Sequence, residues 1–118
     1  MHKVVILIEP SQEWLENEKK WPTFLHLAED MPGLRREAIS YVARFLGGAT
    51  PFMQMHELFF DSLAEAEQAL NSPQGKAAGR TLREMTGGHM TLFLAEHKED
   101  SLEHIRSYLN NNDQTGSA

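Results

Sequence analysis

The sequence predicts a single α+β domain in which a four-stranded antiparallel sheet carries two main helices on one face. The length of 118 residues is that of one ordinary domain. Short apolar runs alternate with stretches of helical periodicity, in the order strand, helix, strand, strand, helix, strand. Hydrophobic residues make up 41% of the chain and charged residues 24%, so the chain has enough apolar side chains for a core.

The first strand is predicted over Val4 to Ile8, which are five consecutive apolar and mostly β-branched residues. A helical stretch follows over residues 11–31, and Pro22 should interrupt it near Lys20 because proline removes a helix hydrogen bond. The second strand is predicted over residues 34–46, from alternating side chains. The apolar stripe of the helical stretch consists of Trp14, Trp21, Phe24, Leu25, Ala28 and Met31.

The third strand is predicted over residues 52–60 and the fourth over residues 89–96. Between them, Ser62 should cap one helix and Ser72 the next, because a serine hydroxyl accepts from the free N–H groups of the first helical turn. The resulting β-α-β-β-α-β order is the ferredoxin-like arrangement, with both main helices on one face of the sheet.

The domain organisation follows from the same patterns. Residues 1–98 form the ferredoxin-like domain, and residues 99–110 are predicted to add a C-terminal helix with an apolar stripe. Residues 111–118 are small and polar, which is typical of a flexible tail.

Composition excludes several classes of partner and chemistry. The net charge of −6 argues against nucleic acid, because an acidic domain repels phosphates. The chain has no cysteine, which excludes thiol nucleophiles and disulfides and is compatible with a reducing compartment. The N-terminal apolar run is too short for a signal peptide or a membrane span. We therefore expect a cytoplasmic protein with no membrane partner.

Both faces of the predicted sheet are apolar. Val4 to Ile8 does not alternate with polar residues, although a sheet with one wet face should alternate. Helices can cover only one face, and an apolar face left in water is an association site. The simplest symmetric cover is a second copy of the chain, so the sequence predicts a homodimer.

Three short motifs in order resemble one known family. They are Pro32-Gly33-Leu34-Arg35-Arg36, Glu57-Leu58-Phe59-Phe60-Asp61-Ser62-Leu63 and Ser72-Pro73-Gln74-Gly75-Lys76-Ala77-Ala78. With their spacing they cover roughly residues 3–96 and resemble the EthD-like family of the dimeric α/β-barrel superfamily. The resemblance implies homodimers whose sheets face each other in a barrel. The wider superfamily includes cofactor-free monooxygenases, lactone isomerases, polyketide cyclases and haem-degrading enzymes, and fold alone does not choose among them.

The chain departs from this family at one position. Many members carry His-x-Pro in the first helix, and counting back from Pro32 places that histidine at Phe24 and that proline at His26. His26 is no simple substitute, because two helical residues turn the side-chain direction by about 200°. An activity that needed the family's histidine is therefore in doubt here.

Glu57 and His89 are the candidate catalytic residues. If Phe60 packs under the helices, Glu57 points into the barrel, where an apolar wall suits a general acid or base. His89 is in phase with Thr91 and Phe93, so it is expected to face the barrel beside Glu57. The structural alternatives are a cross-strand partner for Glu57, such as Arg36 or Arg44, and a solvated strand end for His89.

The expected wall of the binding site is apolar and aromatic. Its residues are Tyr41, Met53, Met55, Phe59, Thr91 and Phe93. His56 shares a face with Phe60 and is expected at the helix–sheet boundary, bonded to the backbone. The histidine spacings match no metal motif, and the chain lacks the glycine-rich loops of nucleotide sites, so we expect no metal and no cofactor.

Two classes of function remain open at this point. In the first, the protein is a small cofactor-free enzyme, a monooxygenase/oxidoreductase or an isomerase, acting on an apolar or aromatic metabolite. In the second, it is a non-catalytic dimeric ligand-binding or accessory protein of a degradation pathway. The polar pair expected in an apolar pocket favours the first class, and the missing helix-one histidine favours the second.

Overall fold

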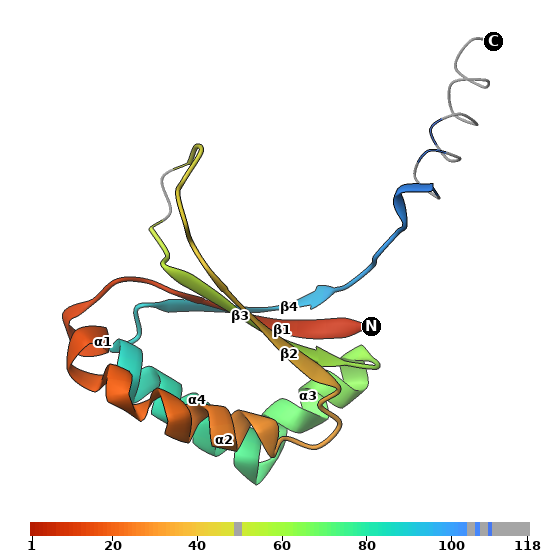
Figure 1. Ribbon diagram of the computed structural model, residues 1–118. Helices are drawn as coiled ribbons and strands as arrows, with labels where there is room; N and C mark the ends of the chain where they lie inside the picture. Colours follow the sequence, from red (N-terminus) through yellow and green to blue (C-terminus); the bar gives the residue numbers. More distant parts are fainter. Residues whose placement is uncertain (49–50, 104–105, 107–108, 110–118) are drawn as a thin grey trace.

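The computed structural model describes residues 1–48, 51–103, 106 and 109. One four-stranded antiparallel sheet runs in the order β2-β3-β1-β4, and all helices that precede β4 lie on one side of it (Figure 1). The strands are β1 (His2–Ile8), β2 (Arg36–Tyr41), β3 (Gln54–Phe60) and β4 (Met90–Glu96). The helices are α1 (Gln12–Asn17), the 3-10 turn η1 (Glu18–Lys20), α2 (Trp21–Glu29), α3 (Leu63–Asn71) and α4 (Pro73–Thr86). The predicted α+β ferredoxin-like fold is confirmed.

The helices begin where the sequence places their caps. The Ser62 hydroxyl accepts from the backbone N–H of Glu65 at 3.1 Å, and the Ser72 hydroxyl accepts from that of Gly75 at 3.0 Å. Pro22 lies in the first turn of α2, where its missing N–H has no helical partner to lose. The predicted interruption near Lys20 is confirmed, with η1 joining the two helical pieces.

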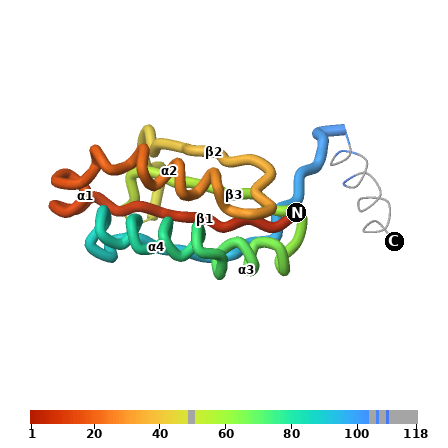
Figure 2. The backbone as a smooth tube through the Cα atoms, turned by 90° about the horizontal axis from the view of Figure 1, so that it is seen from below, coloured from red at the N-terminus to blue at the C-terminus, as the bar shows by residue number. Residues whose placement is uncertain are grey.

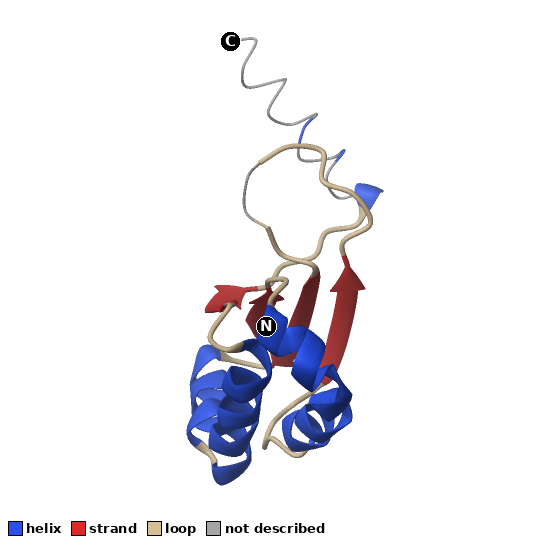
Figure 3. Cartoon of the chain, turned by 90° about the vertical axis from the view of Figure 1, so that its left-hand side faces the viewer, coloured by secondary structure: helices blue, strands red, loops and turns tan. Residues whose placement is uncertain are grey.

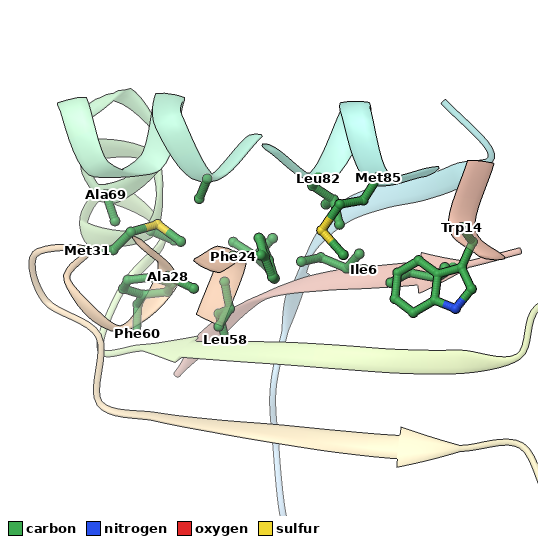
Figure 4. Close-up of a cluster of buried hydrophobic side chains, with 14 residues drawn as sticks. Ile6, Trp14, Phe24, Ala28, Met31, Leu58, Phe60, Ala69, Leu82 and Met85 are labelled. Atoms are coloured by element: carbon green, nitrogen blue, oxygen red, sulfur yellow. The ribbon is translucent and has the colours of Figure 1, made fainter. Parts of the chain in front are cut away.

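The core lies between the helical layer and the sheet (Figures 3 and 4). Figure 2, which views the molecule from the helix side, shows α1 and α2 in one row and α4 and α3 in a second row beside it. Four residues of the predicted stripe are buried, namely Trp14, Phe24, Ala28 and Met31. They meet Phe60 from β3 and Leu82 from α4, both less than 3% exposed, so the amphipathic pattern of the first helices correctly identified their buried side.

The edges of the elements differ from the prediction. β2 spans Arg36–Tyr41 instead of residues 34–46, because its regular pairing with β3 ends at Gln54, with one further bond from Val42 N–H to the Met53 carbonyl. The loop beyond it rises on the side opposite the helices (Figure 1). The predicted C-terminal helix over residues 99–110 falls partly outside the described residues. No helix in the described part of the chain is long and apolar enough to cross a membrane.

Candidate functional site

Strand register divides the sheet into two faces with different surroundings. The face that packs on the helices is called the helix face, and the opposite one the open face. Val5 lies opposite Glu57 on β3 and Phe93 on β4, which places all three on the open face. The open face carries Lys3, Val5, Leu7, Arg36, Ala38, Ser40, Met55, Glu57, Phe59, Thr91, Phe93 and Ala95.

Glu57 lies on the open face, as the sequence predicts. Its Oε2 is 2.5 Å from Lys3 Nζ, and the two side chains are only 12% and 18% exposed. The partner is Lys3 from β1 and not Arg36 or Arg44, and the Arg36 guanidinium binds Glu99 instead. The pair sets a largely desolvated ammonium and carboxylate beside the apolar residues Val5 and Phe93, with Lys3 Nζ 5.5 Å from the Phe59 ring centroid.

His89 does not approach Glu57. It precedes β4 opposite Glu9, with Nδ1 at 3.8 Å from Glu9 Oε2, and its side chain is 54% exposed. Glu57 pairs with Val5, four residues away along β1, which is about 13 Å in an extended strand. The expected meeting of Glu57 and His89 is therefore wrong, although both follow the phase of the open face.

Phe59 is the centre of a charged cluster at the other end of the open face. The Arg36 guanidinium lies 4.0 Å from the Phe59 ring centroid, and the His97 ring meets Phe59 edge-on at 4.9 Å. Glu99 Oε1 lies within hydrogen-bond distance of both side chains, at 2.6 Å from His97 Nε2 and 2.9 Å from Arg36. The hydrogen bond from His97, with help from Arg36, lowers the pKa of Glu99. The segment after β4 thus crosses the open face to reach β2.

The expected binding wall divides between the two faces. Met55, Phe59, Thr91 and Phe93 lie on the open face. Tyr41 lies opposite Gln54 and on the helix face, so its expected place beside Glu57 is wrong. Met53 precedes β3 and packs against the core near Trp14, because the bend at Met53 breaks the alternation that would have placed it on the open face.

A histidine–carboxylate pair lies on the helix face. His56 is fully buried, and its Nε2 is 3.0 Å from Glu37 Oε2 on β2. Its ring packs against both Trp21 and Phe24, with centroid separations of 5.4 and 5.7 Å. The expected helix–sheet position of His56 is correct, but its partner is the Glu37 carboxylate and not the backbone. Burial lowers the pKa of His56, and the hydrogen bond and charge of Glu37 offset this only in part, so the ring is neutral.

The neutral state of His56 predicts how stability depends on pH. The unfolded imidazole titrates near its ordinary pKa of 6.5, and the folded one titrates below that value. Below about pH 6.5 the unfolded chain therefore binds a proton that the folded chain does not. As the pH is lowered further, the free energy of unfolding decreases until the pH reaches the pKa of His56 in the folded protein. Urea unfolding at several pH values should show a smaller decrease for His56→Phe than for the wild type. The exposed His26, changed to glutamine, is the control, and equal slopes for His56→Phe and wild type would contradict the neutral ring.

An aromatic cavity opens beside this pair. It has a volume of about 540 Å³ and is lined by Trp14, Glu18, Lys19, Trp21, Pro22, Tyr41 and Gln54. A second cavity of about 340 Å³ shares Trp14 and is lined otherwise by Pro10, Ser11, Leu15 and Met53. Trp14 and Trp21 meet edge-on at 5.7 Å. The larger cavity is a shallow, open depression in which three aromatic side chains lie beside Glu18, Lys19 and Gln54, and we call it the tryptophan cavity. Aromatic walls with a few polar groups are typical of small-molecule sites.

Sequence reasoning missed Gln54, the pairing of Glu37 with His56, and the role of Trp21. Gln54 and His56 lie on the same strand face as Leu58 and Phe60. Two polar residues on a buried strand face are the sequence signal that could have pointed to them. In the described part of the chain, no group of three or more histidine, aspartate or glutamate side chains could hold a metal ion.

Comparison with known proteins places the fold. The chain is similar to an ethyl tert-butyl ether (EthD) family protein from Bacillus halodurans C-125, with 27% identity, a TM-score of 0.72, and coverage of 83% of this chain and 99% of that one. The resemblance inferred from the three motifs is thereby confirmed. Neither the protein-family models nor the curated proteins gave a match.

Two more distant structures share the fold alone. A dimeric ferredoxin-like protein of unknown function from Jannaschia sp. CCS1 has 16% identity and a TM-score of 0.61, covering 81% of this chain and 97% of that one. SnoaB, a cofactor-independent oxygenase from Streptomyces nogalater, has 13% identity and a TM-score of 0.57, covering 86% and 95%. These neighbours include both a dimeric protein and an enzyme that works without a cofactor.

Proposed function

We propose that this chain, with its EthD-like ferredoxin-like fold, is a homodimeric protein that binds a small apolar or aromatic metabolite without a cofactor. The observation that carries the proposal is the tryptophan cavity, an open depression of about 540 Å³ whose walls include Trp14, Trp21 and Tyr41. Aromatic side chains bind flat apolar ligands well because they offer large rigid surfaces at little cost in conformational entropy.

The homodimer is supported by the open face. Phe93 is 45% exposed, and Leu7 and Met55 are only half-buried, while α1, α2, α3 and α4 all lie on the other side of the sheet. Two such faces packed together would bury these side chains in an interface of about the standard 1,600 Å². The Jannaschia protein is dimeric, which agrees with this arrangement.

The binding proposal has a direct readout, because the only two tryptophans of the chain both line the cavity. Adding para-methylanisole, an apolar aromatic probe, to isotope-labelled protein should shift both indole N–H resonances in the NMR spectrum. Tyr41→Ala should weaken binding about 3- to 10-fold, because one aromatic contact of ~0.5–1.5 kcal/mol is lost. Tyr41 is 68% exposed, so its removal should leave the fold intact.

Ser40→Ala is the matched control, since Ser40 neighbours Tyr41 on β2 but lies on the open face. It should bind the probe as the wild type does. Unchanged indole resonances at millimolar probe, or shifts confined to open-face residues, would refute the tryptophan cavity as the binding site.

Acid/base catalysis in the barrel is the second candidate function, and the desolvated Lys3–Glu57 pair favours it. A carboxylate on an apolar wall beside an ammonium could exchange a proton with a bound metabolite, as in a cofactor-free monooxygenase/oxidoreductase or an isomerase. His89 is too distant to share this role. The buried Phe24 at the place of the family's histidine favours the non-catalytic function instead.

A further inference from the structure

Two buried polar atoms on the helix face of β3 have no hydrogen-bond partner among the described residues. They are Nε2 of Gln54 and Nδ1 of His56. Gln54 is 5% exposed and His56 0% exposed, so the two side chains are removed from bulk water. Most buried polar groups in folded proteins are paired, so each one that lacks a protein partner calls for an explanation, and a ligand or an ordered water is one.

The two atoms have opposite hydrogen-bonding character. The Glu37 carboxylate accepts at 3.0 Å from His56 Nε2, so Nε2 carries the ring proton and Nδ1 is left as an acceptor. The Gln54 amide nitrogen is a donor. Because Gln54 and His56 are two residues apart on one face of a strand, their Cα atoms are about 7 Å apart. A hydroxyl group can bridge them, since one oxygen both donates and accepts.

The tryptophan cavity reaches one of these two residues. Gln54 is part of its wall, and Trp21, which is also in the wall, lies against His56 with 5.4 Å between ring centroids. Trp21 is only half-buried and follows directly on η1, at the junction of two helical pieces. His56 does not itself line the cavity, so a ligand that touches Gln54 would reach His56 only by displacing the Trp21 indole.

We propose that the tryptophan cavity selects phenolic ligands, whose ring packs against Trp14, Trp21 and Tyr41 and whose hydroxyl donates to His56 Nδ1 and accepts from Gln54 Nε2. Glu37 is the positioning residue, because it fixes the tautomer that leaves Nδ1 as an acceptor. The inference rests on the proposed function and adds the polar group that the ligand must carry. An ordered water at the same place is the alternative that the test must separate.

The test compares two isomers that differ in one feature. Para-ethylphenol has a hydroxyl, and para-methylanisole has the same atoms with the hydroxyl replaced by a methyl ether. Wild-type protein should bind the phenol at least about tenfold more tightly in NMR or calorimetric titrations, since about 1.4 kcal/mol, one good hydrogen bond, corresponds to tenfold. Gln54→Leu and His56→Phe should each abolish this preference while keeping the affinity for the ether.

Ser40→Ala, on the open face, should keep the full preference. Equal wild-type affinity for the two isomers would overturn the phenol inference in favour of an ordered water, and would leave the proposed function standing. Binding of neither isomer would overturn both. If His56→Phe does not fold, as judged by circular dichroism, Gln54→Leu decides alone, and a retained preference in that variant contradicts the inference.

Discussion

Replacing Phe93 by aspartate is expected to convert the proposed homodimer into a monomer or an aggregate. Phe93 lies on the open face of β4 and is 45% exposed in the single subunit, so the lone chain should tolerate a charge there. In the dimer the same carboxylate would be buried without a partner, beside the negative charge of Glu57 across β1. A buried unpaired charge costs ~3–5 kcal/mol, which weakens dimerisation by about 10² to 10³-fold or more.

Sedimentation at micromolar concentration measures this effect, and Leu92→Asp is its matched control. Leu92 is the preceding residue of the same strand, is similarly exposed at 49%, and points to the helix face. The control should remain dimeric. A dimer that survives Phe93→Asp but dissociates in Leu92→Asp would show that the chain associates through the other side of the sheet.

Replacing Gly75 by alanine is expected to destabilise the fold severely. A Cβ atom at Gly75 would lie 2.1 Å from the Ala69 carbonyl oxygen and 2.7 Å from that of Leu70. Both obstacles are backbone atoms at the junction of α3 and α4, so no side-chain rotation can relieve the clash. Overpacking of this kind costs ~3 kcal/mol or more, a large part of the stability of a small domain. The melting temperature should fall by about 10 °C or more.

Gly79→Ala is the control within the same helix. A Cβ there meets nothing within 4 Å, and Gly79 lies in the interior of α4. Alanine should therefore stabilise the protein by about 0.5–1 kcal/mol, because glycine is a poor helix former. Similar melting temperatures for the two variants would mean that α3 and α4 do not approach each other as closely as the structure has them.

The features that could be predicted from the sequence are those with strong local signals. The caps at Ser62 and Ser72 and the interruption at Pro22 are set within a few residues, so each could be placed without knowledge of the tertiary structure. The open-face position of Glu57 followed from Phe60, because neighbours three apart on a strand point to opposite sides.

The pairing between strands could not be read in the same way. Alternation groups Tyr41 with Glu37, but it does not say which face the pair takes when both faces of β2 are mixed in character. Only the register with β3 sets Glu37 beside His56 and Tyr41 beside Gln54. The predicted position of His89 beside Glu57 was wrong for a related reason, because the distance between the two residues depends on where β4 starts along β1.

The most direct test of the binding site is a crystal structure of the protein with para-ethylphenol. The account predicts the aromatic ring in the tryptophan cavity, in contact with Trp14, Trp21 and Tyr41, and the hydroxyl oxygen about 2.7–3.2 Å from Gln54 Nε2 and His56 Nδ1. A ring bound instead on the open face beside the Lys3–Glu57 pair would contradict it and would favour acid/base catalysis in the barrel.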